Sequence, residues 1–163
     1  MIKMQHFGYS CCPSLKSPDT KPSILLLVLI GLTLFSCKKN NSNTVFGSIE
    51  GSWQMIVVTD ITTNTTLTKP SSIQKDVVIT FVPNSSTTGT FTGETPSNDI
   101  WQNNYTLGGE TISIPVLSMT KVAETTWGKQ FVDNITSAQH YSFESGGKLN
   151  IKTTNKILTF KKL

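Results

Sequence analysis

His140 is the one histidine in the chain after His6. Alternate residues of an extended strand share a face, so His140, Ser142 and Glu144 would project from the same side. A serine, a histidine and an acid are the components of nucleophilic hydrolysis. Three neighbours on one strand face do not provide the geometry of nucleophile, base and orienting group that this catalysis needs. The segment therefore predicts a solvated strand face rather than a catalytic centre.

A second set of titratable residues brackets a short polar segment. Glu94 and Asp99 lie on either side of the residues TPSN, and paired carboxylates can perform acid–base chemistry. The residues between them are typical of a turn, and their spacing does not match a calcium-binding loop. With His140 as the single histidine and no further cysteine after Cys37, a zinc site would depend on carboxylates. We expect no catalytic residue, no metal site and no cofactor.

The strongest candidate binding residues lie in the segment NDIWQNNY, between Gly93 and Thr106. A flat indole beside amide side chains is a combination that binds carbohydrate or peptide, because it joins an apolar face to orienting hydrogen bonds. The candidate ligand-binding residues are Asn98, Trp101, Asn104 and Tyr105. A structural interpretation stays open, in which Asn98 and Tyr105 fix a loop and fill the core, and Trp101 is itself buried.

Cys37 ends the apolar run Ile24–Ser36, and its last four residues, LFSC, have the pattern of a bacterial lipobox. The run is short for a membrane-spanning helix but has the length of a secretory signal core, with Lys21 just before it. In a lipobox the cysteine thiolate takes a diacylglyceryl group, and the small residue before it fits the signal peptidase. Removal of residues 1–36 would leave lipidated Cys37 on a membrane, each buried methylene contributing about 0.8 kcal/mol. A membrane anchor helix or a buried core helix is the alternative for this run.

Charge and cysteine content narrow the possible partners. From position 37 onward the sequence holds eleven lysines against nine Asp and Glu residues, and it contains no arginine. Arginine is the preferred partner of phosphates and base edges, so we expect no nucleic-acid partner. The domain also has no cysteine pair, so its stability would come from packing alone. We expect a monomer with one small domain, residues 49–163, joined to the membrane by a polar tether, residues 37–48.

Alternating apolar residues predict short strands through most of this domain. Ser52–Ile61 alternates with Trp53, Met55 and Val57 on one face, and Asp76–Val82 repeats the pattern. The remaining predicted segments are strands at Thr88–Thr92, Asn104–Leu107, Thr111–Ile114, Gln139–Glu144, Leu149–Lys152 and Ile157–Lys161, and an exposed loop or ragged hairpin at Thr59–Ser72. This spacing predicts a mainly β fold, an antiparallel meander that is closed or nearly closed.

One segment has a helical period. The residues that share its apolar face are Trp127, Phe131, Ile135 and Ala138. Thr125 or Thr126 would provide the N-cap. We therefore expect one helix at about Thr126–Ser137, packed on the sheet, with both Trp127 and Trp53 in the core.

Short motifs follow one another in a fixed order along the domain. They are Gly51-Ser-Trp53, Phe91-Thr-Gly93, Asn98, Asn104-Tyr105, Ile112-Ser-Ile114, Leu117–Lys121, the helix with Trp127 and Phe131, Tyr141, Gly147-Lys-Leu149 and Leu158-Thr-Phe160. This order, from about Ile49 to Leu163, resembles the META domain, a family of small heat-shock-type envelope lipoproteins. The resemblance implies a lipocalin-like barrel or half-barrel with one helix and no known enzymatic activity. Many META domains carry cysteines that are absent here, which removes a disulfide or redox role. A related calycin-like lipoprotein family is the alternative.

The sequence thus predicts a bacterial envelope lipoprotein with a non-catalytic META-like domain, a binding or structural accessory at the membrane surface. Its partners would be the membrane, through Cys37, and other envelope proteins or glycans. The alternative is a lipocalin-type carrier of a small apolar ligand, and an enzyme would need convergent titratable groups. Lys38, where an inner-membrane retention signal has aspartate, favours the outer membrane. The absence of an acidic run after Cys37 favours its periplasmic face.

Overall fold

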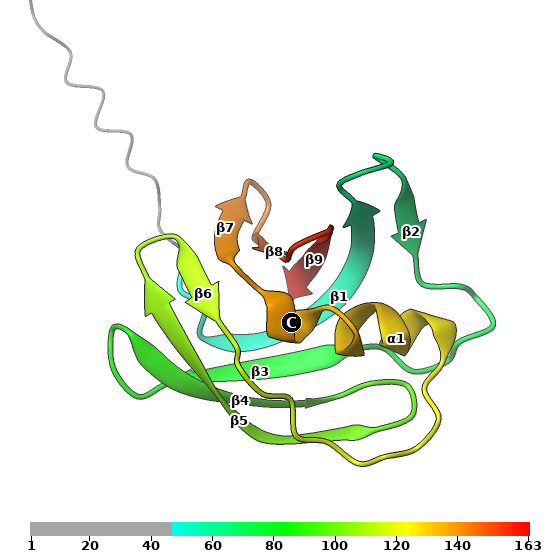
Figure 1. The fold of residues 1–163 in the computed structure, drawn as a ribbon, viewed down its shortest axis with the longest axis horizontal. Helices are drawn as coiled ribbons and strands as arrows, with labels where there is room; N and C mark the ends of the chain where they lie inside the picture. The colour runs from blue at the N-terminus through cyan, green and yellow to red at the C-terminus, as the bar shows by residue number, and fades with distance from the viewer. Residues whose placement is uncertain (1–46) are drawn as a thin grey trace, which may run out of the picture. The chain divides into compact units, whose positions relative to one another are not determined.

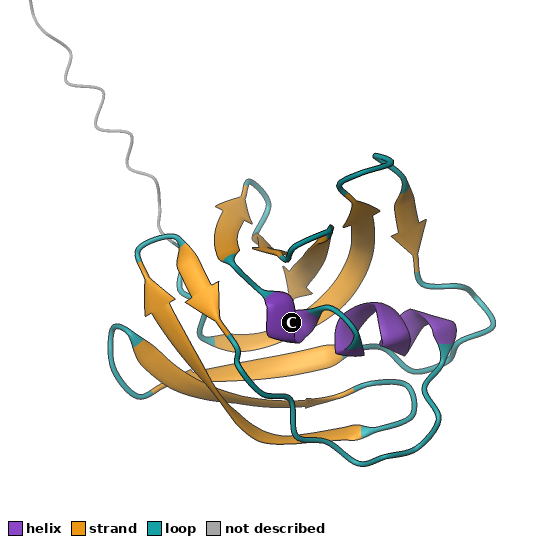
Figure 2. Cartoon of the chain, viewed as in Figure 1, coloured by secondary structure: helices purple, strands orange, loops and turns teal. Residues whose placement is uncertain are grey.

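A computed structural model of the chain describes residues 47–163, so the predicted lipidation site Cys37 lies outside the described residues. Strands dominate the described part, and Figure 2 shows them as arrows, with the short helical segments in purple. The elements are β1 (Gly51–Asp60), β2 (Thr66–Thr68), β3 (Val78–Pro83), β4 (Thr88–Glu94), β5 (Asp99–Gly108), β6 (Thr111–Ser113), the helix α1 (Thr126–Val132), the 3₁₀ helix η1 (Ile135–Ser137), β7 (His140–Glu144), β8 (Lys148–Lys152) and β9 (Lys156–Lys162).

The strands form one antiparallel sheet that closes on itself (Figure 1). Their order is β2-β1-β3-β4-β5-β6-β7-β8-β9, and β1 also pairs with β9, which completes the ring. The exposed strand β2 pairs only with Val57–Thr59, in the C-terminal half of β1. It therefore lies outside the closed ring of strands. The junction of β6 with β7 has a single register pair, Thr111 with His140. The predicted mainly β, barrel-like fold with one helix is confirmed.

The alternation of β1 changes phase at a bulge. Trp53 and Met55 face the core as predicted. Ile56 then has no partner on β9, because Met55 pairs with Phe160 and the next pair joins Val57 to Thr159. The extra residue moves the buried position from Val57 to Val58, since side chains alternate between the two faces of a strand. The prediction that Val57 belongs to the inner face was therefore wrong.

Aromatic side chains fill the interior of the barrel. The Phe81 ring packs against Phe91, tilted at 44° with a centroid distance of 5.6 Å, and meets Tyr105 edge-on at 5.1 Å. Edge-to-face contacts are among the arrangements that aromatic pairs prefer. The fully buried aromatic residues are Trp53, Phe81, Phe91, Tyr105, Trp127, Phe131 and Phe160. The core is thus built from bulky rings contributed by strands around the ring and by α1.

The predicted helix is shorter than expected. It begins as predicted, with Thr125 as N-cap accepting a hydrogen bond from the Gly128 N–H at 3.0 Å. It ends at Val132, and η1 follows after Asp133 and Asn134. The residues predicted for its inner face, Trp127, Phe131 and Ile135, are all fully buried, while Ala138 is half-buried. The helical period of the apolar residues therefore predicted the buried face correctly. It did not predict that the helix ends at Val132.

Candidate functional site

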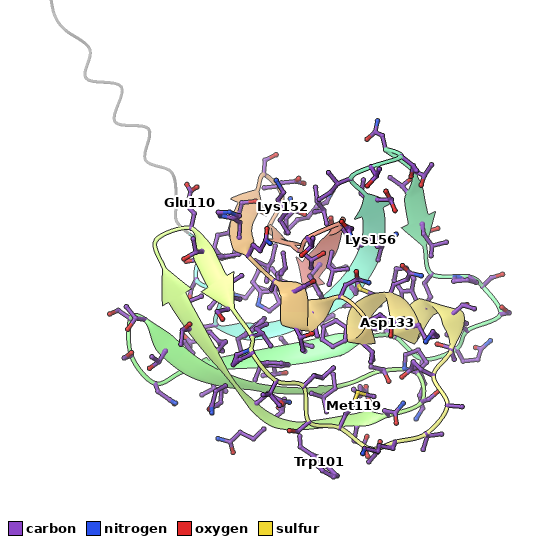
Figure 3. The ribbon with its side chains drawn as sticks, in the orientation of Figure 1. Trp101, Glu110, Met119, Asp133, Lys152 and Lys156 are labelled. Atoms are coloured by element: carbon purple, nitrogen blue, oxygen red, sulfur yellow. The ribbon has the colours of Figure 1, made fainter. Side chains whose placement is uncertain are left out.

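The structure separates the four candidate binding residues into two pairs. All four lie on β5 or just before it, and the strand begins at Asp99, earlier than the predicted start at Asn104. Asn98 and Tyr105 are buried, with exposed fractions of 3% and 1%. Trp101 is 58% exposed and points away from the barrel (Figure 3), and Asn104 is also exposed. The interpretation that Trp101 is a core residue is therefore incorrect. Asn98 and Tyr105, in contrast, are buried, in agreement with the structural interpretation of these two residues.

A bulge in β5 turns Trp101 outward. Gly93 of β4 pairs with Ile100, and Phe91 pairs with Asn103. Thr92 alone therefore lies opposite two residues of β5, Trp101 and Gln102. Ile100 and Asn103 are both buried, so the two residues between them occupy the outer side. Bulges of this kind commonly change the direction of a side chain next to a functional site.

Asn103 and Ser118 hold the backbone of Trp101 from both sides. The Trp101 N–H donates to the Ser118 carbonyl at 3.0 Å, and the Asn103 Nδ2 donates to the Trp101 carbonyl at 2.6 Å. The Asn103 side chain also donates to the Ser118 carbonyl at 3.1 Å and accepts from the Ser118 N–H at 2.6 Å. The backbone that carries the exposed indole is therefore fixed before any ligand arrives, which lowers the entropic cost of binding.

Asn103 was not among the residues predicted for this site, although it belongs to the same amide-rich segment as the predicted Asn104. Its position relative to Tyr105 would have predicted its role. Asn103 lies two residues before this buried tyrosine, so strand alternation places its amide on the inner face, where a polar group needs partners.

Asn98 ties the turn before β5 to the segment that precedes α1. Its Oδ1 accepts from the Val122 N–H at 2.7 Å and from the Thr120 hydroxyl at 3.1 Å. Its Nδ2 donates to the Val122 carbonyl at 3.0 Å and to the Glu124 carboxylate at 2.9 Å. All the hydrogen-bonding positions of this amide are thus used inside the protein. Asn98 is a structural clamp rather than a free ligand contact.

The Glu124 carboxylate completes this clamp. It accepts from the Thr95 hydroxyl, from Asn98 and, at 2.9 Å, from the Thr125 N–H. Burial alone would raise the pKa of Glu124, but these donors outweigh burial and lower it. The carboxylate also lies where a side chain on Gly128 would project, since a Cβ there would be 2.2 Å from Oε1. Glu124 therefore joins the β4–β5 turn to the start of the helix.

Tyr105 points into the core and is not available to an external ligand. A Cβ on Gly89 would lie 2.3 Å from its hydroxyl oxygen, so the absence of a side chain at Gly89 makes room for the ring. Burial raises the pKa of the Tyr105 hydroxyl. Within residues 47–163 this hydroxyl has no hydrogen-bond partner, and the same holds for the indole N–H of Trp127.

Around Trp101, the outer side of β3, β4 and β5 carries mostly hydroxyl and amide groups. We call this surface the outer threonine face; its residues are Thr80, Val82, Thr88, Thr90, Thr92, Trp101, Gln102, Asn104 and Thr106. Thr80 pairs with Thr92 across the sheet, and Thr90 pairs with Asn104. The Thr80 hydroxyl is also 2.8 Å from that of Ser52 on β1. Neighbouring strands lie about 4.8 Å apart, which places these groups in regular rows.

A groove of about 260 Å³ adjoins this face at the bulge. Its lining residues are Gln102, Asn103, Asn104, Pro115, Val116 and Ser118. Another groove, of about 300 Å³, lies near β1 and β2, where Lys156 forms an ion pair with Asp60 at 2.7 Å. The first groove combines amide groups with the apolar surface of Pro115 and Val116, and it lies beside an exposed indole. This combination makes it the stronger candidate for ligand contact.

The titratable residues considered from the sequence lie on the solvated outer side. His140, Ser142 and Glu144 are exposed on one face of β7, as predicted, while Tyr141 and Phe143 are half-buried on the other. Glu94 and Asp99 pair directly across β4 and β5 and are exposed. Within residues 47–163, no group of three His, Cys, Asp or Glu side chains is placed to hold a metal ion. The described helices are too short or too polar to cross a membrane.

Comparisons with known proteins bear on the fold alone. No family model matches the chain, and no curated protein matches it. A solved structure described as the NMR structure of a protein from Burkholderia xenovorans is similar, with a TM-score of 0.55. The match covers 70% of this chain and 82% of that one, with 18% of residues identical. A similar fold therefore occurs in that Burkholderia xenovorans protein.

Proposed function

We propose that the chain is a bacterial envelope lipoprotein whose META-like domain acts as a non-catalytic binding or structural accessory at the membrane surface. Lipidation at Cys37 would anchor it, on the periplasmic face of the outer membrane. The lipobox at LFSC and the absence of an acidic run after it support this location. Attachment to the membrane would leave the barrel free to contact envelope proteins or glycans.

The observation that carries the binding role is an exposed tryptophan on a barrel whose other two tryptophans are buried in the core. Trp53 and Trp127 are 2% and 0% exposed, whereas Trp101 is 58% exposed. Exposed aromatic residues on a fixed backbone are typical of binding surfaces, where they contribute a large share of the affinity. Trp101 also lies at a bulge held by Asn103 and Ser118, so its exposure follows from a specific local structure.

The second candidate, a lipocalin-type carrier, is favoured by one feature. The Tyr105 hydroxyl and the Trp127 indole N–H are buried without partners in the described part of the chain. Polar atoms of this kind can orient a ligand inside a barrel. However, a carrier needs interior space, and aromatic rings occupy the centre of this barrel. The accessory role therefore agrees better with the packing.

Two measurements test the two parts of this proposal. Mass spectrometry of the mature N-terminus should identify an acylated Cys37, and an unmodified N-terminus elsewhere would contradict the location. For the binding role, immobilised full-length protein should retain material from detergent-solubilised envelopes, and Trp101→Ala should reduce the retained amount. Equal retention by Trp101→Ala and by a control variant would contradict the binding role of this face.

A further inference from the structure

The outer threonine face, as defined above, contains no charged residue. The outward residues of β4 from Thr88 to Thr92 and of β5 from Trp101 to Thr106 carry hydroxyl, amide or indole groups and no charge. Glu94 and Asp99 pair with each other at the end of the face next to Trp101, and Asp99 lies two residues before Trp101 on β5. Neither β4 nor β5 contains a lysine, so an anionic ligand would find no opposite charge on these strands, whereas an uncharged ligand rich in hydroxyl groups would find matching donors and acceptors.

The bulge adds an apolar platform to this polar face. The Trp101 indole is large and flat, and its backbone is fixed by the hydrogen bonds to Ser118 and Asn103. A sugar ring has an apolar face of C–H groups and a polar rim of hydroxyl groups. Stacking the C–H face on the indole would leave the hydroxyl rim near the threonine and asparagine side chains of β4 and β5. The indole therefore complements the C–H face of a sugar ring, and the neighbouring polar side chains complement its hydroxyl groups.

The residues that line the groove beside the bulge indicate which substituent the sugar carries. Gln102 and Asn104 supply amide donors and acceptors, while Pro115 and Val116 supply apolar surface. An N-acetyl substituent has the complementary composition, one amide and one methyl group. The groove volume of about 260 Å³ is just below the range of roughly 300–1,000 Å³ found for complete small-molecule sites. The groove is thus suited to one substituted unit of a longer chain.

We propose that the outer threonine face binds an uncharged glycan that carries N-acetyl groups. One sugar ring stacks on Trp101, and the acetamido group of a neighbouring position enters the groove lined by Gln102, Asn104 and Val116. This assignment rests on the proposed binding role of the domain and names the class of ligand for it. An envelope protein that docks on Trp101 is the competing occupant.

The three tryptophans of the chain provide a selective test, because all lie in the described part and Trp101 alone is exposed. Iodide in solution should therefore quench mainly the fluorescence of Trp101. The full-length protein in detergent is titrated with chitohexaose, an uncharged chain of N-acetylglucosamine, and with cellohexaose, which has the same linkage without acetamido groups. Chitohexaose should protect Trp101 from iodide saturably, and cellohexaose should bind about tenfold more weakly.

Variants measured by calorimetry separate stacking from loss of structure. Trp101→Ala should weaken chitohexaose binding by about thirtyfold, the effect of removing an aromatic anchor. Trp101→Phe should retain part of the affinity, because a ring remains. Leu67→Ala on β2 changes another exposed apolar residue and should leave binding unchanged. Gln102→Ala should reduce the preference for chitohexaose over cellohexaose.

Three results would overturn the assignment. They are the absence of chitohexaose binding, binding that Trp101→Ala does not weaken, and equal binding of the two oligosaccharides. If chitohexaose does not bind but Trp101→Ala still reduces retention of envelope proteins, the proposed ligand class is wrong and the binding role of Trp101 is supported. If Trp101→Ala affects neither, the binding role fails as well.

Discussion

The side-chain amide of Asn103 donates to the carbonyl of Trp101, two residues earlier on the same strand, at 2.6 Å. A buried polar group therefore fixes the backbone of an exposed aromatic one. The same amide exchanges two further hydrogen bonds with the Ser118 backbone. The inner and outer sides of β5 are coupled at this point, since the buried asparagine stabilises the bulge that exposes the indole.

Asn103→Ala is expected to destabilise the domain and to weaken binding through Trp101. The substitution leaves the Trp101 carbonyl and the Ser118 N–H without these bonds, and unpartnered buried groups cost about 1–3 kcal/mol. Chemical unfolding and envelope retention are measured on the same protein. The adjacent exposed amide provides the control, since Asn104→Ala should change the free energy of unfolding by less than about 0.5 kcal/mol. Equal stability of the two variants would contradict the role of Asn103.

Phe131→Ala should lower the free energy of unfolding strongly. The ring is fully buried and meets Phe160 edge-on at a centroid distance of 6.5 Å. Removing a buried phenylalanine side chain typically costs about 3–5 kcal/mol, a large part of the stability of a small domain. The denaturation midpoint measures the effect, and Lys129→Ala on the exposed side of α1 is the control. A midpoint that hardly moves would mean that the helix does not pack on the barrel.

Tyr105→Phe should leave stability unchanged or increase it. The hydroxyl is buried without a partner in residues 47–163, and such a group costs about 1–3 kcal/mol. Tyr105→Ala, in contrast, should be strongly destabilising because it removes a packed ring. Thermal unfolding compares the two variants. A clear loss of stability in Tyr105→Phe would reveal a partner for the hydroxyl, such as a bound water or a ligand, and would strengthen the carrier alternative.

Glu124 should make the domain less stable in acid. Its carboxyl pKa is lowered in the folded state below the ordinary value of a glutamate, because the hydrogen bonds from Thr95, Asn98 and Thr125 outweigh the effect of burial. The stabilisation is therefore fully present above the unfolded-state pKa and is lost as the pH falls through the folded-state pKa. Urea unfolding between pH 7 and pH 3 should show a smaller loss for Glu124→Gln than for the parent protein.

The control for this pH series is Glu110→Gln, which makes the same change at an exposed carboxylate. It should keep the pH dependence of the parent protein. An unchanged pH dependence in Glu124→Gln would show that its hydrogen bonds with Thr95 and Asn98 do not stabilise the ionised form.

The sequence predicted the strands whose apolar residues alternate, and it failed where side chains depart from that rule. Trp53 precedes the bulge of β1 and Phe81 lies on β3, so period-two alternation was sufficient to place both in the core. A bulge adds one residue to a strand, and no particular residue type marks it in the sequence. For this reason Val57 was wrongly predicted on the inner face, and the exposure of Trp101 was not predicted. The start of β5 was missed because Asn98–Asn104 is rich in residues with low strand propensity.

The candidate site depends on contacts between distant segments, and these were not visible from the sequence. Asn98 was recognised as important, but its partners at Val122 and Glu124 lie more than twenty residues away. Asn103 and Ser118 are also distant, fifteen residues apart along the chain. Trp101 could be identified as a candidate because its residue type is unusual in a polar segment. Its exposure could be decided only from the register of β4 and β5.

The binding role of Trp101 is tested most directly by envelope retention of Trp101→Ala, with unfolding measured on the same protein. We expect the free energy of unfolding of Trp101→Ala to lie within about 0.5 kcal/mol of that of the parent protein, because the indole is exposed. We expect the affinity to fall by about thirtyfold, with Leu67→Ala unaffected in both respects. Retention that is unchanged in Trp101→Ala would contradict the binding role of Trp101, and so would a loss of retention that merely accompanies unfolding.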